Sequence, residues 1–121
     1  MHLIAVVDDD EAVRRSMDRM LRAAGYTAAL YATGGEFLDS LGRQAPACVL
    51  VDGQLPDMHG RDVLARLASR AAGVAAIVVT GHDTPEYRRA ATAHSVAAFF
   101  TKPFDPDELL AAIQAAVERR Q

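Results

Sequence analysis

The sequence predicts an α/β fold with a mostly parallel sheet, and three observations predict it. Five short apolar runs are separated by segments in which apolar residues recur at helical spacing. Most of these runs lack polar alternation, which is typical of strands covered by helices on both faces. Strand and helix patterns also alternate along the whole chain. This alternation favours parallel strands joined by right-handed crossovers, with helices on both sides of the sheet.

The predicted strands are the five apolar runs themselves. In chain order they are Leu3–Val7, Ala28–Tyr31, Cys48–Val51, Ala75–Val79 and Ala97–Phe100. Runs of this length suit strands, whereas helices need about ten residues or more. Cys48, the only cysteine, is therefore expected to be a small core residue with no redox role.

Helices are predicted between the strands from apolar periodicity and from capping residues. The first helix begins after Asp10, a predicted N-cap, and stops at Gly25. Its apolar face consists of Val13, Met17, Met20, Leu21 and Ala24. The second follows the Thr33–Glu36 capping box, and the fourth follows Thr84 and Pro85 over Glu86–His94.

The third and fifth helices show the same kind of evidence. Gly60 precedes an apolar set that marks the third, consisting of Val63, Leu64 and Leu67. Asp105 as N-cap, Pro106 at the first helical position and Glu108 begin the fifth. The apolar face of that helix consists of Leu109, Leu110, Ile113, Ala116 and Val117.

Composition excludes several classes of protein. The chain has 121 residues, enough for one domain with a genuine core, and we expect residues 1–121 to form a single domain. A net charge of -3 argues against direct binding of nucleic acid. One cysteine cannot form an internal disulfide, which suits a reducing compartment. No apolar run approaches the roughly 20 residues of a membrane helix. The start, "MHLIAVVDDD", does not resemble a signal peptide, so we expect a cytoplasmic protein.

Polar residues follow four of the five predicted strands. Asp8, Asp9 and Asp10 follow the first, Asp52 the third, Thr80 the fourth and Lys102 the fifth. In open parallel sheets, ligands bind beyond the carboxyl ends of the strands, where these side chains would converge. The second strand adds nothing comparable, which indicates an edge strand away from the site.

The convergence of carboxylates predicts a cation site. Carboxylates held close together repel one another, and a hard divalent ion with oxygen ligands relieves that repulsion. Mg2+ is the best candidate, because it takes few protein carboxylates and keeps positions for water and phosphate oxygens. Lys102 is the only lysine among 13 basic residues. Its compact ammonium fits a crowded site better than a planar guanidinium, and beside Thr80 it suits a phosphoryl group.

These residues, in this order, resemble the receiver domain of two-component response regulators. The matching features are the acidic pair after the first strand, Asp52 with Pro56, Thr80, and Lys102 before Pro103. The resemblance covers about Leu3 to Val117. It implies a flavodoxin-like three-layer sandwich with five parallel strands in the order 2-1-3-4-5 and five helices. "VVDDDEAVRRSM" and "TKPFDPDELL" look most like receivers that precede helix-turn-helix transcription domains.

The resemblance also implies how the acidic residues act. Asp52 accepts a phosphoryl group from a phosphohistidine on a sensor histidine kinase, in a reaction that requires Mg2+. Asp9 and Asp52 bind the ion directly, the Gln54 backbone carbonyl is a third ligand, and Asp8 acts mainly through water. In this interpretation the chain is no enzyme beyond phosphorylating itself and removing that group.

The remaining residues of the motif form a switch in the same interpretation. Lys102 pairs with the acceptor carboxylate and then with a phosphoryl oxygen, and its peptide bond to Pro103 is cis. Thr80 grips the phosphoryl group, and Phe99 then turns inward and changes the surface of the fourth helix and fifth strand. That surface would act on an output domain or DNA-binding partner outside this chain, and the activated state could be a homodimer.

Several residues depart from the usual receiver pattern or have roles that the sequence alone leaves open. Receivers commonly have glycine where Ser95 stands, and a positive φ there would cost serine about 1 kcal/mol. Gln54 and His82 lie where they would tune hydrolysis of the acyl phosphate. Asp57 and Asp62 are interpreted as solvated charges. The four histidines show no metal-ligand spacing.

Two other functions use similar residues. A haloacid-dehalogenase-type phosphohydrolase also has an aspartate nucleophile, but Ala12 breaks the motif that begins at Asp8 and Asp10. A degenerate receiver that only docks partners is the second alternative, and the complete acidic set argues against it.

Overall fold

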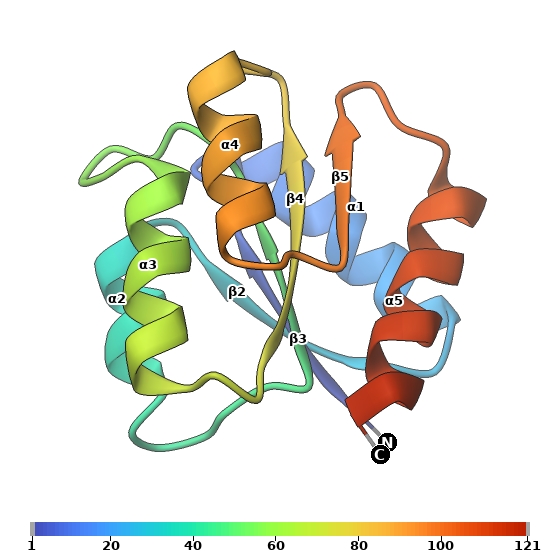
Figure 1. Ribbon diagram of the computed structural model, residues 1–121. Helices are drawn as coiled ribbons and strands as arrows, with labels where there is room; N and C mark the ends of the chain where they lie inside the picture. Colours follow the sequence, from blue (N-terminus) through green and yellow to red (C-terminus); the bar gives the residue numbers. More distant parts are fainter. Residues whose placement is uncertain (1, 121) are drawn as a thin grey trace.

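The computed structural model describes residues 2–120, in which five strands alternate with five helices (Figure 1). In order they are β1 (Leu3–Val7), α1 (Glu11–Ala23), β2 (Thr27–Tyr31), α2 (Gly34–Ser40), β3 (Cys48–Val51), α3 (Gly60–Arg70), β4 (Ala75–Thr80), α4 (Pro85–Ala93), β5 (Ala98–Thr101) and α5 (Pro106–Arg120). Every predicted strand is present within one residue of its predicted bounds. None of the described helices is long and apolar enough to span a membrane.

The strands form one parallel sheet in the order β2-β1-β3-β4-β5, as the resemblance implied. Its register brings the carboxyl ends together. Val7, the last residue of β1, pairs with Tyr31 on one side and with Val51 on the other. Thr80 pairs with Thr101 at the ends of β4 and β5. Residues that directly follow these positions therefore lie along one edge of the sheet.

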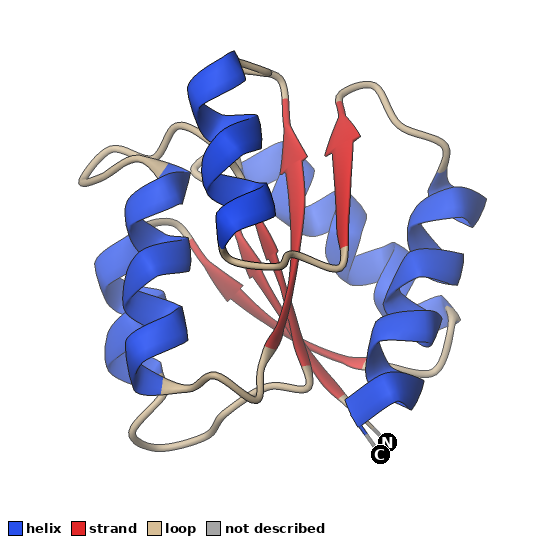
Figure 2. Ribbon diagram, in the orientation of Figure 1, coloured by secondary structure: helices blue, strands red, loops and turns tan. Residues whose placement is uncertain are grey.

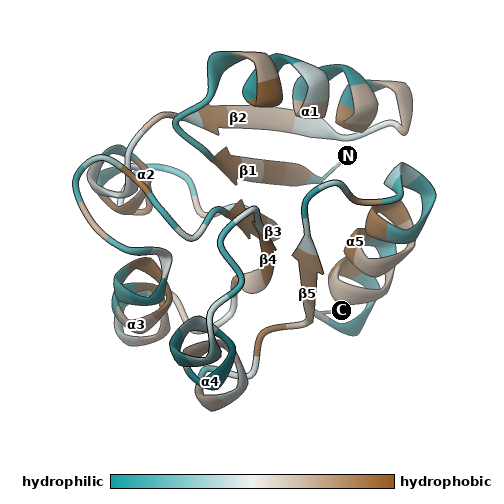
Figure 3. Ribbon diagram, turned by 90° about the horizontal axis from the view of Figure 1, so that it is seen from above, coloured by the Kyte–Doolittle hydropathy of each residue, from teal (hydrophilic) through white to brown (hydrophobic). Residues whose placement is uncertain are grey.

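Helices cover both faces of the sheet (Figures 2 and 3). α1 and α5 lie on one face, and α2, α3 and α4 lie on the other. Side chains alternate along each strand, so Ile4 and Val6 enter the core beneath α1 and α5, whereas Ala5 and Val7 enter the other core. Because both faces are buried, the strands read as continuous apolar runs. The three-layer α/β sandwich with a 2-1-3-4-5 sheet is confirmed.

Capping residues set where the helices begin. Asp10 accepts hydrogen bonds from the backbone N–H groups of Ala12 and Val13, at 2.9 and 3.4 Å. Thr33 and Thr84 cap α2 and α4 in the same way, and Asp105 accepts from the Asp107 N–H at 2.9 Å. These four caps follow the sequence prediction.

The cap of α3 differs from the sequence interpretation. His59 is the N-cap, and its Nδ1 accepts a hydrogen bond from the Arg61 N–H at 3.0 Å. Asp62, interpreted above as a solvated charge, accepts in return from the His59 N–H at 3.2 Å. The reciprocal bonds form a capping box in which a neutral imidazole takes the place of a hydroxyl. Burial, and then the charge of Arg61, lowers the pKa of His59, which favours the neutral imidazole that accepts this bond.

Two helices end with the same hydrogen-bond pattern but with different residues. After α1, Gly25 (φ 92°) donates to Arg22 O and Tyr26 donates to Leu21 O. After α4, Ser95 (φ 55°) donates to Thr92 O, and the next residue donates to Ala91 O. Both are Schellman motifs, which need one residue in the left-handed region. The positive φ considered for Ser95 is therefore present.

Candidate functional site

Three carboxylates meet at the carboxyl edge of the sheet. Asp8 and Asp9 follow β1, and Asp52 follows β3. One carboxylate oxygen from each lies within 4.8 Å of the other two. Asp8 and Asp52 are only 3% and 6% exposed, whereas Asp9 faces solvent. The cluster thus has a buried floor and an open side.

Local backbone bonds hold the two buried carboxylates in place. The Asp52 N–H donates to Val7 O at 3.0 Å, so the first residue after β3 stays in register with β1. Asp8 accepts from the Asp10 N–H at 2.9 Å, and Asp52 accepts from the Gly53 N–H at 2.7 Å. In each carboxylate the other oxygen, Oδ2, faces Lys102 Nζ.

Lys102 lies between the two buried carboxylates. Its Nζ is 2.6 Å from an Asp8 oxygen and 3.8 Å from an Asp52 oxygen. The shorter contact is to Asp8, whereas the resemblance implied that Lys102 pairs with Asp52. The Lys102 N–H donates to Thr80 O at 2.8 Å, which fixes the backbone at the end of β5. The peptide bond between Lys102 and Pro103 is cis.

The Asp52 carboxyl has a raised pKa. Burial is the largest cause and the charge of Asp8 is the second. Lys102, the Gly53 N–H and a hydrogen bond from Thr80 act in the opposite direction and do not fully compensate. A further positive charge close to Asp52 would therefore stabilise its ionised form.

Thr80 and Phe99 lie on the β4–β5 side of the cluster. Thr80 is fully buried, and its Oγ1 accepts from the Gly53 N–H at 3.2 Å and from the His82 N–H at 2.9 Å. Phe99 lies in β5, paired with Val78 of β4, and is half-buried. Thr80 thus contacts the loop that follows Asp52, whereas Phe99 pairs with a residue two positions before Thr80 in β4.

The loop that follows Asp52 is tied to its surroundings. Gln54 is exposed and forms an isolated backbone bridge with His59. Asp57 is not merely solvated, because its two oxygens accept from the N–H groups of Gly34 and Gly35 at 3.0 and 2.8 Å. These bonds place a carboxylate at the N-terminus of α2, where the helix dipole favours it. Sequence reasoning missed this role, since the bonded residues lie more than 20 positions apart.

Tyr87 is a second residue that sequence reasoning missed. It is fully buried in α4, and its hydroxyl is 3.3 Å from the backbone oxygen of Asp52. A side chain at Gly60 would collide with the Tyr87 hydroxyl and with Asp52 O, and one at Gly53 would come within 2.7 Å of Thr80 Oγ1. The two glycines therefore let Tyr87 pack directly behind the acidic cluster. The sequence offered one signal for this role: Tyr87 is an aromatic residue three positions after Thr84, the predicted cap of its helix.

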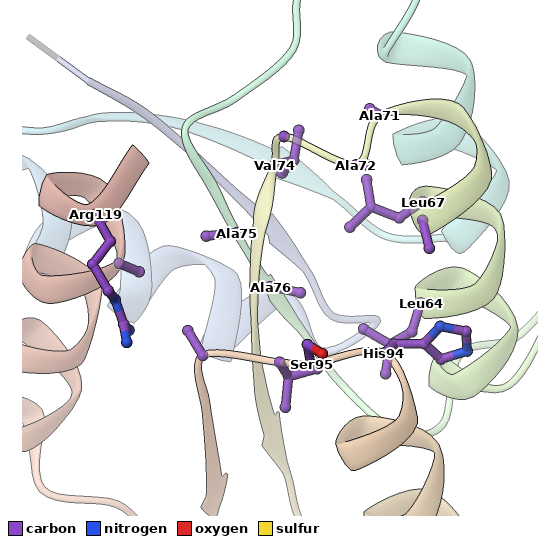
Figure 4. A pocket seen from close by; sticks show the side chains of 15 residues that line it. Leu64, Leu67, Ala71, Ala72, Val74, Ala75, Ala76, His94, Ser95 and Arg119 are labelled. Carbon is purple, nitrogen blue, oxygen red and sulfur yellow. The ribbon is translucent and has the colours of Figure 1, made fainter. Parts of the chain in front are cut away.

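A hollow in the described surface lies away from the acidic cluster (Figure 4). Its volume is about 430 Å³, and it opens near the start of β4, between the ends of α3, α4 and α5. Leu64, Leu67, Val74, His94 and Arg119 line it together with several alanines. The described lining contains no carboxylate. It lies at the opposite edge of the sheet from Asp52, so it is not part of the acidic site.

The acidic cluster fits a divalent cation. Three carboxylate oxygens from separate residues lie close enough to contact one small ion. Oxygen ligands of this type suit Mg2+, and the exposed Asp9 leaves a side on which water or a phosphate oxygen has room. Burial and then the charge of Asp8 raise the pKa of Asp52, so a cation bound beside it would favour its ionised form.

A parallel sheet of this order, with acidic residues at the carboxyl edge beside its central strands, defines the CheY-like class of flavodoxin folds. Residues 4–114 match the response regulator receiver domain family, and the chain belongs to that family. A receiver domain protein (CheY-like) from Methanospirillum hungatei JF-1 has a similar structure, with a TM-score of 0.95 and 30% identity over 99% of this chain and 96% of that one.

Two curated relatives cover almost the whole chain. The response regulator protein TodT of Pseudomonas putida is 35% identical over 117 residues, which are 96% of this chain and 51% of TodT. The transcriptional regulatory protein FixJ of Azorhizobium caulinodans is 33% identical over 116 residues, 96% of this chain and 55% of FixJ. The chain thus spans about half the length of these relatives.

Family membership decides between the functional classes considered above. The chain is a component of two-component signalling and not a catalytic enzyme in the usual sense. The phosphohydrolase alternative is therefore set aside. Membership also implies a kinase as partner and is consistent with a metal at the acidic residues.

Proposed function

We propose that the chain is a phosphorylation-dependent switch in which Asp52 is the phosphoacceptor. The observation that carries this proposal is the position of its carboxylate, which shares a cluster with Asp8 and Asp9 and lies 3.8 Å from Lys102 Nζ. An Asp52 oxygen attacks the phosphorus of a phosphohistidine on a sensor histidine kinase. The phosphorus–nitrogen bond breaks, and the imidazole leaves with the electron pair.

The residues around Asp52 would each contribute to that transfer. Asp9, Asp52 and the Gln54 backbone carbonyl would hold Mg2+, with Asp8 acting mainly through water, and the ion would neutralise charge on the carboxylates and phosphoryl oxygens. Lys102 would move from Asp8 toward a phosphoryl oxygen, and Thr80 would donate its hydroxyl to another.

The output would be a change of surface over α4, β5 and α5. When Thr80 turns toward the phosphoryl group, Phe99 would turn inward into the vacated space. Similarity to FixJ, a transcriptional regulatory protein, supports a role in transcription. With a net charge of -3, residues 1–121 would act as one receiver unit that binds no nucleic acid itself. We place it in the cytoplasm, acting on an output domain or DNA-binding partner, with a homodimer as one form of the activated state.

Intact-mass measurement after incubation with acetyl phosphate and Mg2+ tests the acceptor. We expect the wild type to gain one phosphoryl group and Asp52→Asn to gain none. Asp57→Asn is the matched control, because it removes a carboxylate from the same loop but outside the cluster, and it should still be phosphorylated. An adduct that survives Asp52→Asn would reject the assignment. Failure of the wild type to gain mass would favour a domain that only docks partners.

A further inference from the structure

We propose that Arg88 is a positioning residue that holds the Phe99 ring in place before phosphorylation. The inference rests on the proposed function, in which Phe99 moves when Asp52 is phosphorylated. It adds a route by which the acceptor reaches Phe99, through the loop between β4 and α4.

Two successive residues of α4 contact the Phe99 ring. The guanidinium carbon of Arg88 lies 4.3 Å from the ring centroid, over the face of the ring. The Tyr87 ring meets Phe99 edge to face, with centroids 5.5 Å apart. A cation over an aromatic face is attracted by the electron density of the ring. Phe99 therefore cannot turn without losing its contact with Arg88 or moving the start of α4.

Arg88 is itself fixed by Asp83. Its Nε and Nη2 donate to the two oxygens of Asp83 at 2.8 and 2.9 Å. This bidentate pair sets the plane of the guanidinium, which a single contact would not. The Thr101 hydroxyl, at the end of β5, lies 3.5 Å from the same carboxylate. The loop, the helix and the strand are thus joined around Phe99.

Asp83 connects this group to the phosphorylation site. It lies three residues after Thr80, and the intervening His82 N–H donates to Thr80 Oγ1 at 2.9 Å. If the Thr80 hydroxyl turns toward a phosphoryl group, that bond breaks and the loop that carries Asp83 is released. Arg88 then loses its fixed partner, and its hold on Phe99 weakens.

The expected effect follows from population shift. A contact present only in the resting state opposes activation by its own free energy, so its removal favours the activated state. A cation–π contact at an exposed site accounts for roughly a two- to fivefold change in an equilibrium. Arg88→Ala should therefore bind a phosphoryl analogue two to five times more tightly than the wild type.

Titration with beryllofluoride and Mg2+, followed by NMR, tests this prediction. Beryllofluoride mimics a phosphoryl group on a carboxylate, and its half-saturating concentration should fall in Arg88→Ala. Arg88→Lys keeps a cation but loses the bidentate bond to Asp83, so its half-saturating concentration should lie between those of the wild type and Arg88→Ala. Arg89→Ala is the matched control, because Arg89 is the neighbouring exposed arginine and pairs with Glu86 at 3.8 Å. It should bind as the wild type does.

A double mutant separates action through Phe99 from a general effect on α4. In a Phe99→Leu background, Arg88→Ala should no longer change the half-saturating concentration. Equal effects of Arg88→Ala and Arg89→Ala, or an effect that persists without the ring, would overturn the inference. If the wild type does not bind beryllofluoride, the proposed function fails instead. The Phe99 ring-proton shifts of the free protein then decide the inference: they must change in Arg88→Ala and not in Arg89→Ala.

Discussion

Replacement of Ser95 by glycine should stabilise the protein, because a residue with a side chain now occupies the left-handed position that ends α4. Ser95 has a φ of 55°, and no hydrogen bond of the motif depends on its side chain. A left-handed conformation costs an L residue about 1–2 kcal/mol. Glycine removes this cost, but it also makes the unfolded chain more flexible, which lowers the stability of the folded state by about 0.5–1 kcal/mol. The midpoints of these two ranges differ by about 0.75 kcal/mol, so we expect a net gain of about 0.5–1 kcal/mol.

Thermal unfolding followed by far-UV circular dichroism would measure this gain. The chain has 121 residues. At about 2.1 cal/mol/K per residue, the entropy of unfolding is about 250 cal/mol/K, so Ser95→Gly should raise Tm by about 2–4 °C.

Two further substitutions provide controls for that measurement. Gly25→Ser makes the opposite change at the end of α1, where φ is 92°, and should lower Tm. Gly42→Ser adds the same side chain at a position with open space and no positive φ, and should change Tm little. An unchanged or lower Tm in Ser95→Gly, together with a lower Tm in Gly25→Ser, would refute the strain argument for Ser95.

Three other predictions concern the acidic residues. In EDTA at neutral pH, Asp52→Asn should be more stable than the wild type, because the buried Asp52 carboxyl has a raised pKa and its ionisation costs folding free energy. Urea titrations measure this difference in unfolding free energy. The difference should shrink as the pH falls through the raised pKa toward 3.8, where the wild-type carboxyl becomes neutral. Saturating Mg2+ should raise the Tm of the wild type and raise that of Asp9→Asn less, and equal shifts would contradict a site at the cluster. Asp57→Ala should lower stability by about 1 kcal/mol through lost bonds to Gly34 and Gly35. Because hydrogen bonds from Gly35 and Gly34 outweigh burial and lower the pKa of Asp57, its contribution should disappear as pH falls below about 3.8.

The sequence was sufficient for the strands and for most helix starts, because both depend on residues near one another in the chain. The strand ends that moved did so for a tertiary reason. Thr80 belongs to β4 since it pairs with Thr101, and β5 begins at Ala98. Four caps followed from Asp or Thr at the correct spacing, but His59 escaped because histidine seldom takes that role.

The chemistry of the candidate site was also local in origin, whereas its surroundings were not. Each polar residue lies at the end of a strand or within two residues after it, so a parallel sheet brings it to one edge. What escaped prediction depends on contacts across the fold: the shorter bond of Lys102 to Asp8, the packing of Tyr87 behind Asp52, and the stacking of Arg88 on Phe99. No periodicity or spacing encodes such contacts.

The close packing of Tyr87 against Gly60 has a stereochemical consequence for any donor of a phosphoryl group. Tyr87 covers the inner side of Asp52, so if Asp52 is the acceptor, as proposed, an incoming imidazole has to arrive from the solvent side near Asp9. In-line displacement needs the acceptor oxygen, the phosphorus and the departing nitrogen on one axis. In the proposed reaction, the receiver would then fix the direction of that axis, and a kinase would only have to present its histidine along it.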